Sequence, residues 1–189
     1  DLASQCIGAA CAPAPGERWL DACAGAGGKS LQLADLMQRK GTLVATDVRE
    51  YKLEDLRKRA RRAGFPNIQT RAWDGKALRP QHLCLVFNEK EELAAFDGTW
   101  EDFYRVWTIK EEEIAETSQL QARILEAAAP GVKPGGILVY ATCSIFKEEN
   151  REQVQQFLAK HPEFVLERFP HPLSGEPVAD GMLRVTPAD

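Results

Sequence analysis

The segment that most constrains the fold runs from Arg18 to Ser30 and reads RWLDACAGAGGKS. It opens with apolar residues typical of a buried strand, continues through small residues and enters a helical pattern. Glycine and alanine let a backbone turn sharply at the end of a strand and bring its own amide groups against a ligand. The N–H groups of the next helix point into the same space. The segment therefore predicts a strand, a ligand-binding loop and a helix.

Two familiar phosphate-binding loops do not fit this segment. A P-loop needs a glycine five residues before Gly28, where this chain has Cys23. A dinucleotide fingerprint that starts at Gly25 needs a third glycine at the position of Ser30. The remaining interpretation is a loop for a ligand that is part nucleoside and part amino acid. Its candidate binding residues are Cys23, Ala24, Gly25, Ala26, Gly27, Gly28 and Lys29.

Two acidic residues complete the predicted ligand site. The apolar run 41–46 ends at Asp47, about twenty residues beyond the glycines, a spacing at which a carboxylate accepts both ribose hydroxyls. Asp74 follows another short apolar run and is a candidate acceptor for the exocyclic amine of adenine. This order of strands, helices and acids resembles that of S-adenosylmethionine-dependent methyltransferases. A nicotinamide-binding Rossmann unit is the alternative.

Size and composition predict one domain over residues 1–189. A chain of 189 residues with 44% apolar content can bury one sizeable core, and its formal net charge of −4 argues against binding nucleic acid by bulk charge alone. The five cysteines are odd in number and lack zinc-ligand spacing, which favours a reduced cytoplasmic protein without a metal. No apolar run approaches the roughly 18 to 20 residues that cross a bilayer, and no leader opens the chain. We expect a monomer.

The ends of the chain suggest a fragment. It begins at Asp1, and it stops at Asp189 directly after a strand-like run. We therefore expect that an RNA-binding part before residue 1 and a strand after residue 189 are missing.

Helical periodicity and apolar runs give the remaining elements. Helices are predicted over residues 2–12, 29–39, 50–63, about 110–130 and from about 147. Their buried stripes are expected at Leu33, Leu36 and Met37, at Ile114, Leu120, Ile124 and Leu125, and at Val154, Phe157 and Leu158. The basic run 57–62 is either a solvated outer face or a grip for a phosphate backbone, and both interpretations stay open.

The strands are harder to assign. Runs 68–73 and 137–142 are predicted strands, the second covered on both faces. Run 83–87 and a run that opens at Ala95 are both candidate strands, but both cannot be the fourth central strand, and we do not expect 83–87 to be it. Runs 164–169 and 182–185 are expected to be the last strands. The fold class is α/β, a Rossmann-like class I methyltransferase fold, with a mostly parallel sheet and helices on both faces.

The most specific motif lies at the end of the 137–142 strand. Thr142-Cys143-Ser144, reached through residues 132–141 and followed by Glu148-Glu149-Asn150, resembles the signature of the RNA cytosine-5 methyltransferases. Within that family the chain is most similar to the bacterial 16S ribosomal RNA enzymes. Loop 21–29, Asp47 and the Asp74-Gly75 pair also resemble theirs, so the likeness covers most of residues 1–160.

The resemblance implies a reaction that explains why a cysteine belongs at this position. C5 of cytosine is too weak a nucleophile to take a methyl group from a sulfonium, so a thiolate first attacks C6 and pushes electron density onto C5. Cys143 is the implied nucleophile and S-adenosyl-L-methionine the methyl donor. The implied partner is RNA, with ribosomal RNA favoured over transfer RNA, and the target cytosine must leave its stack to reach the thiol.

One departure from the family is serious. Its members carry an Asp-Ala-Pro-Cys motif whose cysteine helps release the product, and this chain has none. Phe96-Asp97 resembles the residues before that strand and Gly98-Thr99 those after the motif, as if everything between were removed. Cys84 could substitute only if run 83–87 is the fourth strand, which we do not expect. Either the protein has the motif and this sequence omits it, or the protein has lost the step that releases the product. A non-catalytic RNA-binding or ribosome-assembly module is therefore the main rival.

Overall fold

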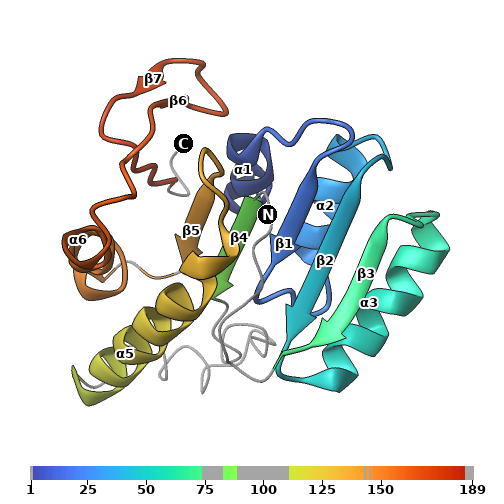
Figure 1. The fold of residues 1–189 in the computed structure, drawn as a ribbon, viewed down its shortest axis with the longest axis horizontal. Helices are drawn as coiled ribbons and strands as arrows, with labels where there is room; N and C mark the ends of the chain where they lie inside the picture. Colours follow the sequence, from blue (N-terminus) through green and yellow to red (C-terminus); the bar gives the residue numbers. More distant parts are fainter. Residues whose placement is uncertain (1, 74–82, 89–110, 143, 145, 186–189) are drawn as a thin grey trace, which may run out of the picture.

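The computed structural model describes the main chain of residues 2–73, 83–88, 111–142, 144 and 146–185 (Figure 1). Side chains are described for these residues except 2–4, 83–88 and 111. Two predicted site residues, Asp74 and Cys143, therefore lie outside the described residues, and so does the run that opens at Ala95.

A five-stranded parallel sheet forms the centre of the molecule, in the order β3-β2-β1-β4-β5 (Figure 1). Because all five strands are parallel, their carboxyl ends share one edge, which is where open α/β sheets bind ligands. The strands are β1 Arg18–Asp21, β2 Thr42–Asp47, β3 Ile68–Ala72, β4 Leu83–Asn88 and β5 Leu138–Thr142.

Helices cover both faces of this sheet, because alternate strand residues point to opposite sides. Trp19 of β1 packs in the cluster that holds Leu33 and Leu53, whereas its neighbour Leu20 packs with Ala128. One face is thus covered by the first three helices and the other by the later ones (Figure 1). These helices are α1 Leu2–Cys11, α2 Gly28–Leu36, α3 Glu50–Ala63, α5 Glu111–Ala128 and α6 Arg151–Lys160, with short 3-10 turns η2 Ala129–Gly131 and η3 Lys147–Glu149. The predicted α/β class is confirmed.

The fourth central strand is β4, so our expectation that run 83–87 is not this strand was wrong. β4 pairs on one side with β1, where Leu85 lies opposite Asp21, and on the other with β5. A continuous apolar run fits a strand that is paired on both edges and covered on both faces. The expectation had relied on the position of the missing family motif instead of on this pattern.

The expected last strands, runs 164–169 and 182–185, do not join the sheet. The main chain instead forms a separate antiparallel pair, β6 Phe169–Pro170 with β7 Pro177–Val178 (Figure 1). Proline cannot donate to a strand ladder, and one lies in each member of this pair. Val165 is 84% exposed, so this segment lacks the burial of a central strand.

Most of the predicted helix stripes face the core, but two leucines do not. Leu33 and Met37 are fully buried, whereas Leu36 is exposed. On α5, Leu120 is exposed and the adjacent Gln121 is buried in its place, because its amide belongs to a polar network described below. Of the helices in the described ranges, none is long and apolar enough to span a bilayer.

Candidate active site

The loop between β1 and α2 is held in place by its own main chain and by β2. The N–H of Ala24 donates to the Thr46 carbonyl at 2.8 Å, and the Thr46 hydroxyl donates to the Ala22 carbonyl at 3.0 Å. Arg59 of α3 donates to the Ala26 carbonyl at 2.7 Å. These contacts come from two elements, β2 and α3, so the loop has a defined shape at the carboxyl edge of the sheet.

Gly27 and Gly28 have different roles in this loop. Gly27 has a φ of 87°, and a Cβ there would meet Cδ1 of the buried Leu56 at 2.1 Å. Gly28 is the first residue of α2 and is exposed, and a Cβ there would meet nothing within 4 Å. Gly27 therefore allows the tight turn, and the space over Gly28 is open to a ligand at the N-terminus of a helix.

The predicted ribose acceptor, Asp47, closes the loop. Its Oδ2 accepts the main-chain N–H of Gly25 at 2.9 Å, and its Oδ1 accepts the main-chain N–H and Nε of Arg49, both at 2.9 Å. Burial pushes the pKa of Asp47 upward, but the hydrogen bonds from Arg49 and Gly25 outweigh it, and the pKa lies below its ordinary value. The carboxyl group is therefore ionised at neutral pH.

Arg49 is a residue that the sequence analysis missed. Its Nη2 also lies 3.2 Å from Oδ2 of Asp47, so four N–H donors converge on a carboxylate that has about four lone-pair sites. Any further hydroxyl on Asp47 would have to displace one of these donors. Two of the four belong to the partly exposed side chain of Arg49, and the other two belong to the main chain. A basic residue two positions after a predicted ligand acid is a signal that could have drawn attention to it.

A second buried carboxyl group lies beneath the loop. Asp21 is fully buried, its Oδ2 accepts the Ser30 hydroxyl at 2.7 Å, and its Oδ1 has no hydrogen-bond partner. Burial raises the pKa of Asp21 to about 6, against the opposing effect of the Ser30 hydrogen bond. Lys29 is buried and lowers this pKa by its charge. The Ser30 hydrogen bond thus ties the start of α2 to the end of β1.

The motif at the end of β5 lies at the same sheet edge. The described residues on either side of position 143 are bound by one side chain, that of Asn150, which immediately precedes α6. Asn150 is therefore a second residue of the site that the sequence analysis gave no role. Its place in the motif resemblance was the available signal.

Cys84 lies on the fourth strand but far from the carboxyl edge of the sheet. It pairs with Leu20 and Leu138, the first residue of β5, whereas position 143 follows the last. Four further residues of β4 separate it from the strand end, about 13 Å of extended chain. Cys84 thus lies on the fourth strand, as a substitute for the motif's cysteine must. Its position along that strand, however, is too far from position 143 for a role in product release.

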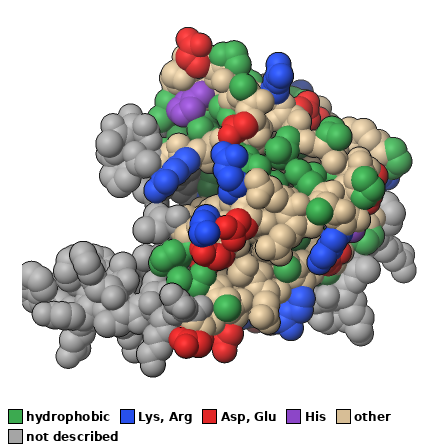
Figure 2. All heavy atoms as spheres, turned by 90° about the vertical axis from the view of Figure 1, so that its left-hand side faces the viewer, with side chains coloured by type: hydrophobic (Ala, Val, Ile, Leu, Met, Phe, Trp, Pro, Cys, Tyr) green, Lys and Arg blue, Asp and Glu red, His purple; other side chains and the backbone are tan. Residues whose placement is uncertain are grey.

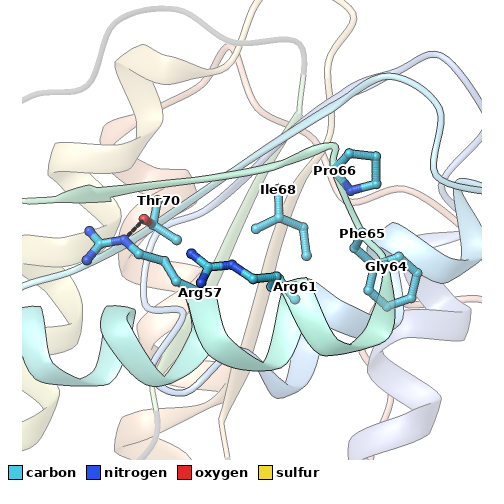
Figure 3. A pocket seen from close by; sticks show the side chains of 8 residues that line it. Arg57, Arg61, Gly64, Phe65, Pro66, Ile68 and Thr70 are labelled. Atoms are coloured by element: carbon cyan, nitrogen blue, oxygen red, sulfur yellow. Dashed lines mark hydrogen bonds between the residues drawn. The ribbon is translucent and has the colours of Figure 1, made fainter.

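Outside this site, the described surface has a further hollow and a mixed distribution of charge. A hollow of about 530 Å³ lies between α3 and β3, lined by Arg57, Arg61, Phe65, Ile68 and Thr70 (Figure 3). Arg57 donates there to the Thr70 hydroxyl at 2.6 Å and forms an ion pair with Glu50.

On the face shown in Figure 2, basic and acidic side chains are interspersed among the described atoms, so no continuous basic patch forms there. In the described part of the chain, no three metal-ligating side chains cluster.

The family model for "16S rRNA methyltransferase RsmB/F" matches residues 9–97 and 98–189. The chain belongs to this family. This match confirms the predicted resemblance. It also favours a methyltransferase fold over the alternative of a nicotinamide-binding Rossmann unit. The two matched parts meet between Asp97 and Gly98, where the Asp-Ala-Pro-Cys motif is missing.

Similar proteins agree with this membership. The probable ribosomal RNA small subunit methyltransferase B of Bacillus subtilis (strain 168) is 31% identical over 199 residues, which cover 99% of the chain and 43% of the relative. The alignment is longer than the chain, so the relative carries residues that this chain lacks. The chain spans less than half the length of that relative.

Solved structures support the predicted class I S-adenosylmethionine-dependent methyltransferase fold. The crystal structure of PH0851 has a TM-score of 0.77 at 36% identity and matches 89% of this chain and 38% of its own. A methyltransferase homolog from Pyrococcus horikoshii has a TM-score of 0.72 at 30% identity, over 89% of this chain and 52% of its own.

Proposed function

We propose that this chain is the catalytic domain, residues 1–189, of a methyltransferase that moves a methyl group from S-adenosyl-L-methionine to C5 of a cytosine in ribosomal RNA. The observation that carries the proposal is that the loop 22–28 and the motif at the end of β5 follow strands of one parallel sheet at the same edge. Membership of the RsmB/F family supports ribosomal RNA over transfer RNA. Cytoplasmic location, a monomeric state and the absence of a metal stay predictions.

The proposed cofactor fits the described residues. The open space over Gly28 suits the amino acid part of the cofactor. The neighbouring loop residues Cys23, Ala24, Ala26 and Lys29 stay proposed binding residues on the sequence pattern alone. The ionised Asp47 suits the ribose once the Arg49 side chain moves. Asp74 is proposed for the adenine amine by family likeness alone. The bound cofactor supplies an electrophilic methyl group on a sulfonium.

The proposed reaction uses the thiolate of Cys143. The thiolate bonds to C6 of the cytosine, the electron pair of the C5–C6 bond takes the methyl group, and S-adenosylhomocysteine leaves. A base then removes the proton from C5, and the returning electron pair expels the thiolate. This last step is the one that the missing family motif serves, so we expect it to be slow in this chain.

The test compares the full-length protein with its Cys143→Ser variant, using labelled cofactor and ribosomal RNA. Wild-type protein should transfer label to 5-methylcytosine, or should accumulate a protein–RNA adduct if release is slow, and the variant should do neither. Equal transfer by both proteins would overturn the proposal.

The same preparation separates the two rival functions. A non-catalytic RNA-binding or assembly module would retain RNA affinity and yield neither methylated product nor adduct. Calorimetry with S-adenosylmethionine and with a nicotinamide dinucleotide distinguishes a methyltransferase from an oxidoreductase.

A further inference from the structure

We infer that Asn150 is a positioning residue of the proposed reaction, because its side chain hydrogen-bonds the residues on both sides of position 143, Thr142 through its hydroxyl and Ser144 through its carbonyl. The inference rests on the proposed function, in which that position supplies the nucleophile. It goes further by assigning a role to a side chain that neither bonds to cytosine nor contacts the cofactor loop.

The side-chain amide of Asn150 makes three hydrogen bonds, all to one short segment. Its Nδ2 donates to the Ser144 carbonyl at 2.8 Å and to the Phe146 carbonyl at 2.7 Å. Its Oδ1 accepts the Thr142 hydroxyl at 2.7 Å. Thr142 is the last residue of β5, so these bonds join the end of the strand to the turn that follows it.

The chemistry of these partners requires an asparagine. Two of them are carbonyl oxygens, which only accept, so the NH₂ group must face them and the amide oxygen must face Thr142. Aspartate has the same shape but cannot donate, and alanine makes none of the bonds. Further bonds close the turn itself: the Ser144 N–H lies 3.3 Å from the Thr142 hydroxyl, and the Phe146 N–H lies 3.2 Å from the Ser144 hydroxyl.

Asn150 is itself anchored through a buried polar network. The adjacent Glu149 is 1% exposed, and its Oε2 accepts the Gln121 amide of α5 at 2.9 Å. The Tyr140 hydroxyl lies 2.7 Å from the Glu149 carbonyl oxygen and 2.9 Å from Oε1 of Gln121. The hydroxyl of Ser118 donates to the Glu148 carbonyl at 2.9 Å. The turn η3 is thus tied to both α5 and β5.

This anchoring gives the amide its proposed function. A buried, hydrogen-bonded network holds a side chain in one geometry, and Asn150 transfers that geometry to Thr142 and Ser144. A nucleophile that is misplaced by about 1 Å loses roughly a hundredfold in rate, because attack needs a close and aligned approach. Loss of the amide should therefore lower kcat far more than it weakens the binding of either substrate.

The test uses full-length protein with Asn150→Asp, Asn150→Ala and a matched control. Gln155→Glu makes the same amide-to-carboxylate change at an exposed position of α6, the helix that follows Asn150. The measurements are kcat, KM for RNA, Kd for S-adenosylmethionine, and the rate at which iodoacetamide alkylates Cys143 in the free protein as a function of pH. Mass spectrometry of the peptide distinguishes Cys143 from the other four cysteines.

We expect both Asn150 variants to lose roughly 30-fold or more in kcat, with KM and Kd within about threefold of wild type. The alkylation profile of Asn150→Asp should move to higher pH, because an added carboxylate disfavours the thiolate. Gln155→Glu should match wild type in every measurement.

Three results would overturn the inference. One is an unchanged kcat and alkylation profile in both Asn150 variants. Another is a loss of activity in Gln155→Glu equal to that in Asn150→Asp. The third is a lower urea midpoint in Asn150→Ala with an unchanged kcat in the folded protein, which would mean a role in folding alone. If wild-type protein neither methylates RNA nor forms an adduct, the proposed function fails, and the alkylation profile still decides the role of Asn150.

Discussion

The main-chain N–H of Gly25 donates a hydrogen bond of 2.9 Å to the carboxylate of Asp47, 22 positions later in the chain. This bond joins the loop after β1 to the end of β2. The loop that would hold the amino acid part of a cofactor and the acid that would hold its ribose are therefore one connected unit. A substitution in the loop or at Asp47 should therefore alter the geometry of both.

Asp47→Asn should weaken the binding of S-adenosylmethionine by about 10- to 100-fold. The substitution removes the negative charge, and charge-assisted hydrogen bonds are about twice as strong as neutral ones. Isothermal titration calorimetry measures the change, with Glu54→Gln on the exposed surface of α3 as the control. If the Asp47→Asn variant bound the cofactor as tightly as wild type, the assignment of the ribose site would be wrong.

Arg49→Gln should instead tighten cofactor binding several-fold. The change removes the Nε and Nη2 donors that occupy the Asp47 carboxylate, so ribose hydroxyls no longer compete with a guanidinium. It also removes a positive charge next to a cationic sulfonium ligand. The same titration provides the measurement, and Arg62→Gln at the exposed end of α3 is the control. Weaker binding would mean that the guanidinium contacts the bound ligand and is not displaced by it.

Gly27→Ala should destabilise the fold by about 2 to 4 kcal/mol, because alanine is strained at a positive φ and its Cβ would overlap a core side chain. The overlap is with Leu56, which is fully buried and has little room to move. Gly28→Ala is the matched control and should change stability by no more than about 0.5 to 1 kcal/mol, since nothing lies within 4 Å of the new methyl group. Urea unfolding of both variants checks the difference; equal midpoints would contradict it.

Asp21→Asn should alter how stability depends on pH. Burial raises the pKa of Asp21 to about 6 from an ordinary value of 3.8, so the folded state holds a proton that the unfolded state has lost. Wild-type stability from this group therefore falls as pH rises from about 4 to 6, and the variant has no such fall. Relative to wild type, the variant should gain about 2 to 3 kcal/mol between pH 4 and pH 7.5.

Urea unfolding at both pH values measures that gain, and any constant effect of the substitution cancels in the comparison. Asp35→Asn, at an exposed position of α2, is the control and should show no comparable change. A gain that is equal at pH 4 and pH 7.5 would show that Asp21 is not the group that titrates.

The parts of the site that the sequence predicted are those that local rules determine. The turn at Gly27 needs a positive φ, and Asp47 ends an apolar strand, so both are readable from short segments. The network of Gln121, Tyr140 and Glu149 was not readable, because it joins residues of three elements. Gln121 occupies a buried helix position that periodicity assigns to an apolar residue, and so the stripe was placed one residue early at Leu120.

The last prediction concerns the contact between α5 and the end of α6. Nε2 of His161 lies 2.8 Å from Oε2 of Glu126, and this hydrogen bond, with one to Glu163, holds the pKa of His161 above its ordinary value. The pair therefore stabilises the fold fully below the unfolded pKa of about 6.5, and the stabilisation disappears as pH rises through the higher folded pKa. His161→Gln should lower the thermal midpoint more at pH 5.5 than at pH 8.5, by a modest amount because the pair is partly solvated. In a Glu126→Gln background this dependence on pH should largely vanish, whereas a deficit that is the same at both pH values would assign the effect to stacking on Phe157 alone.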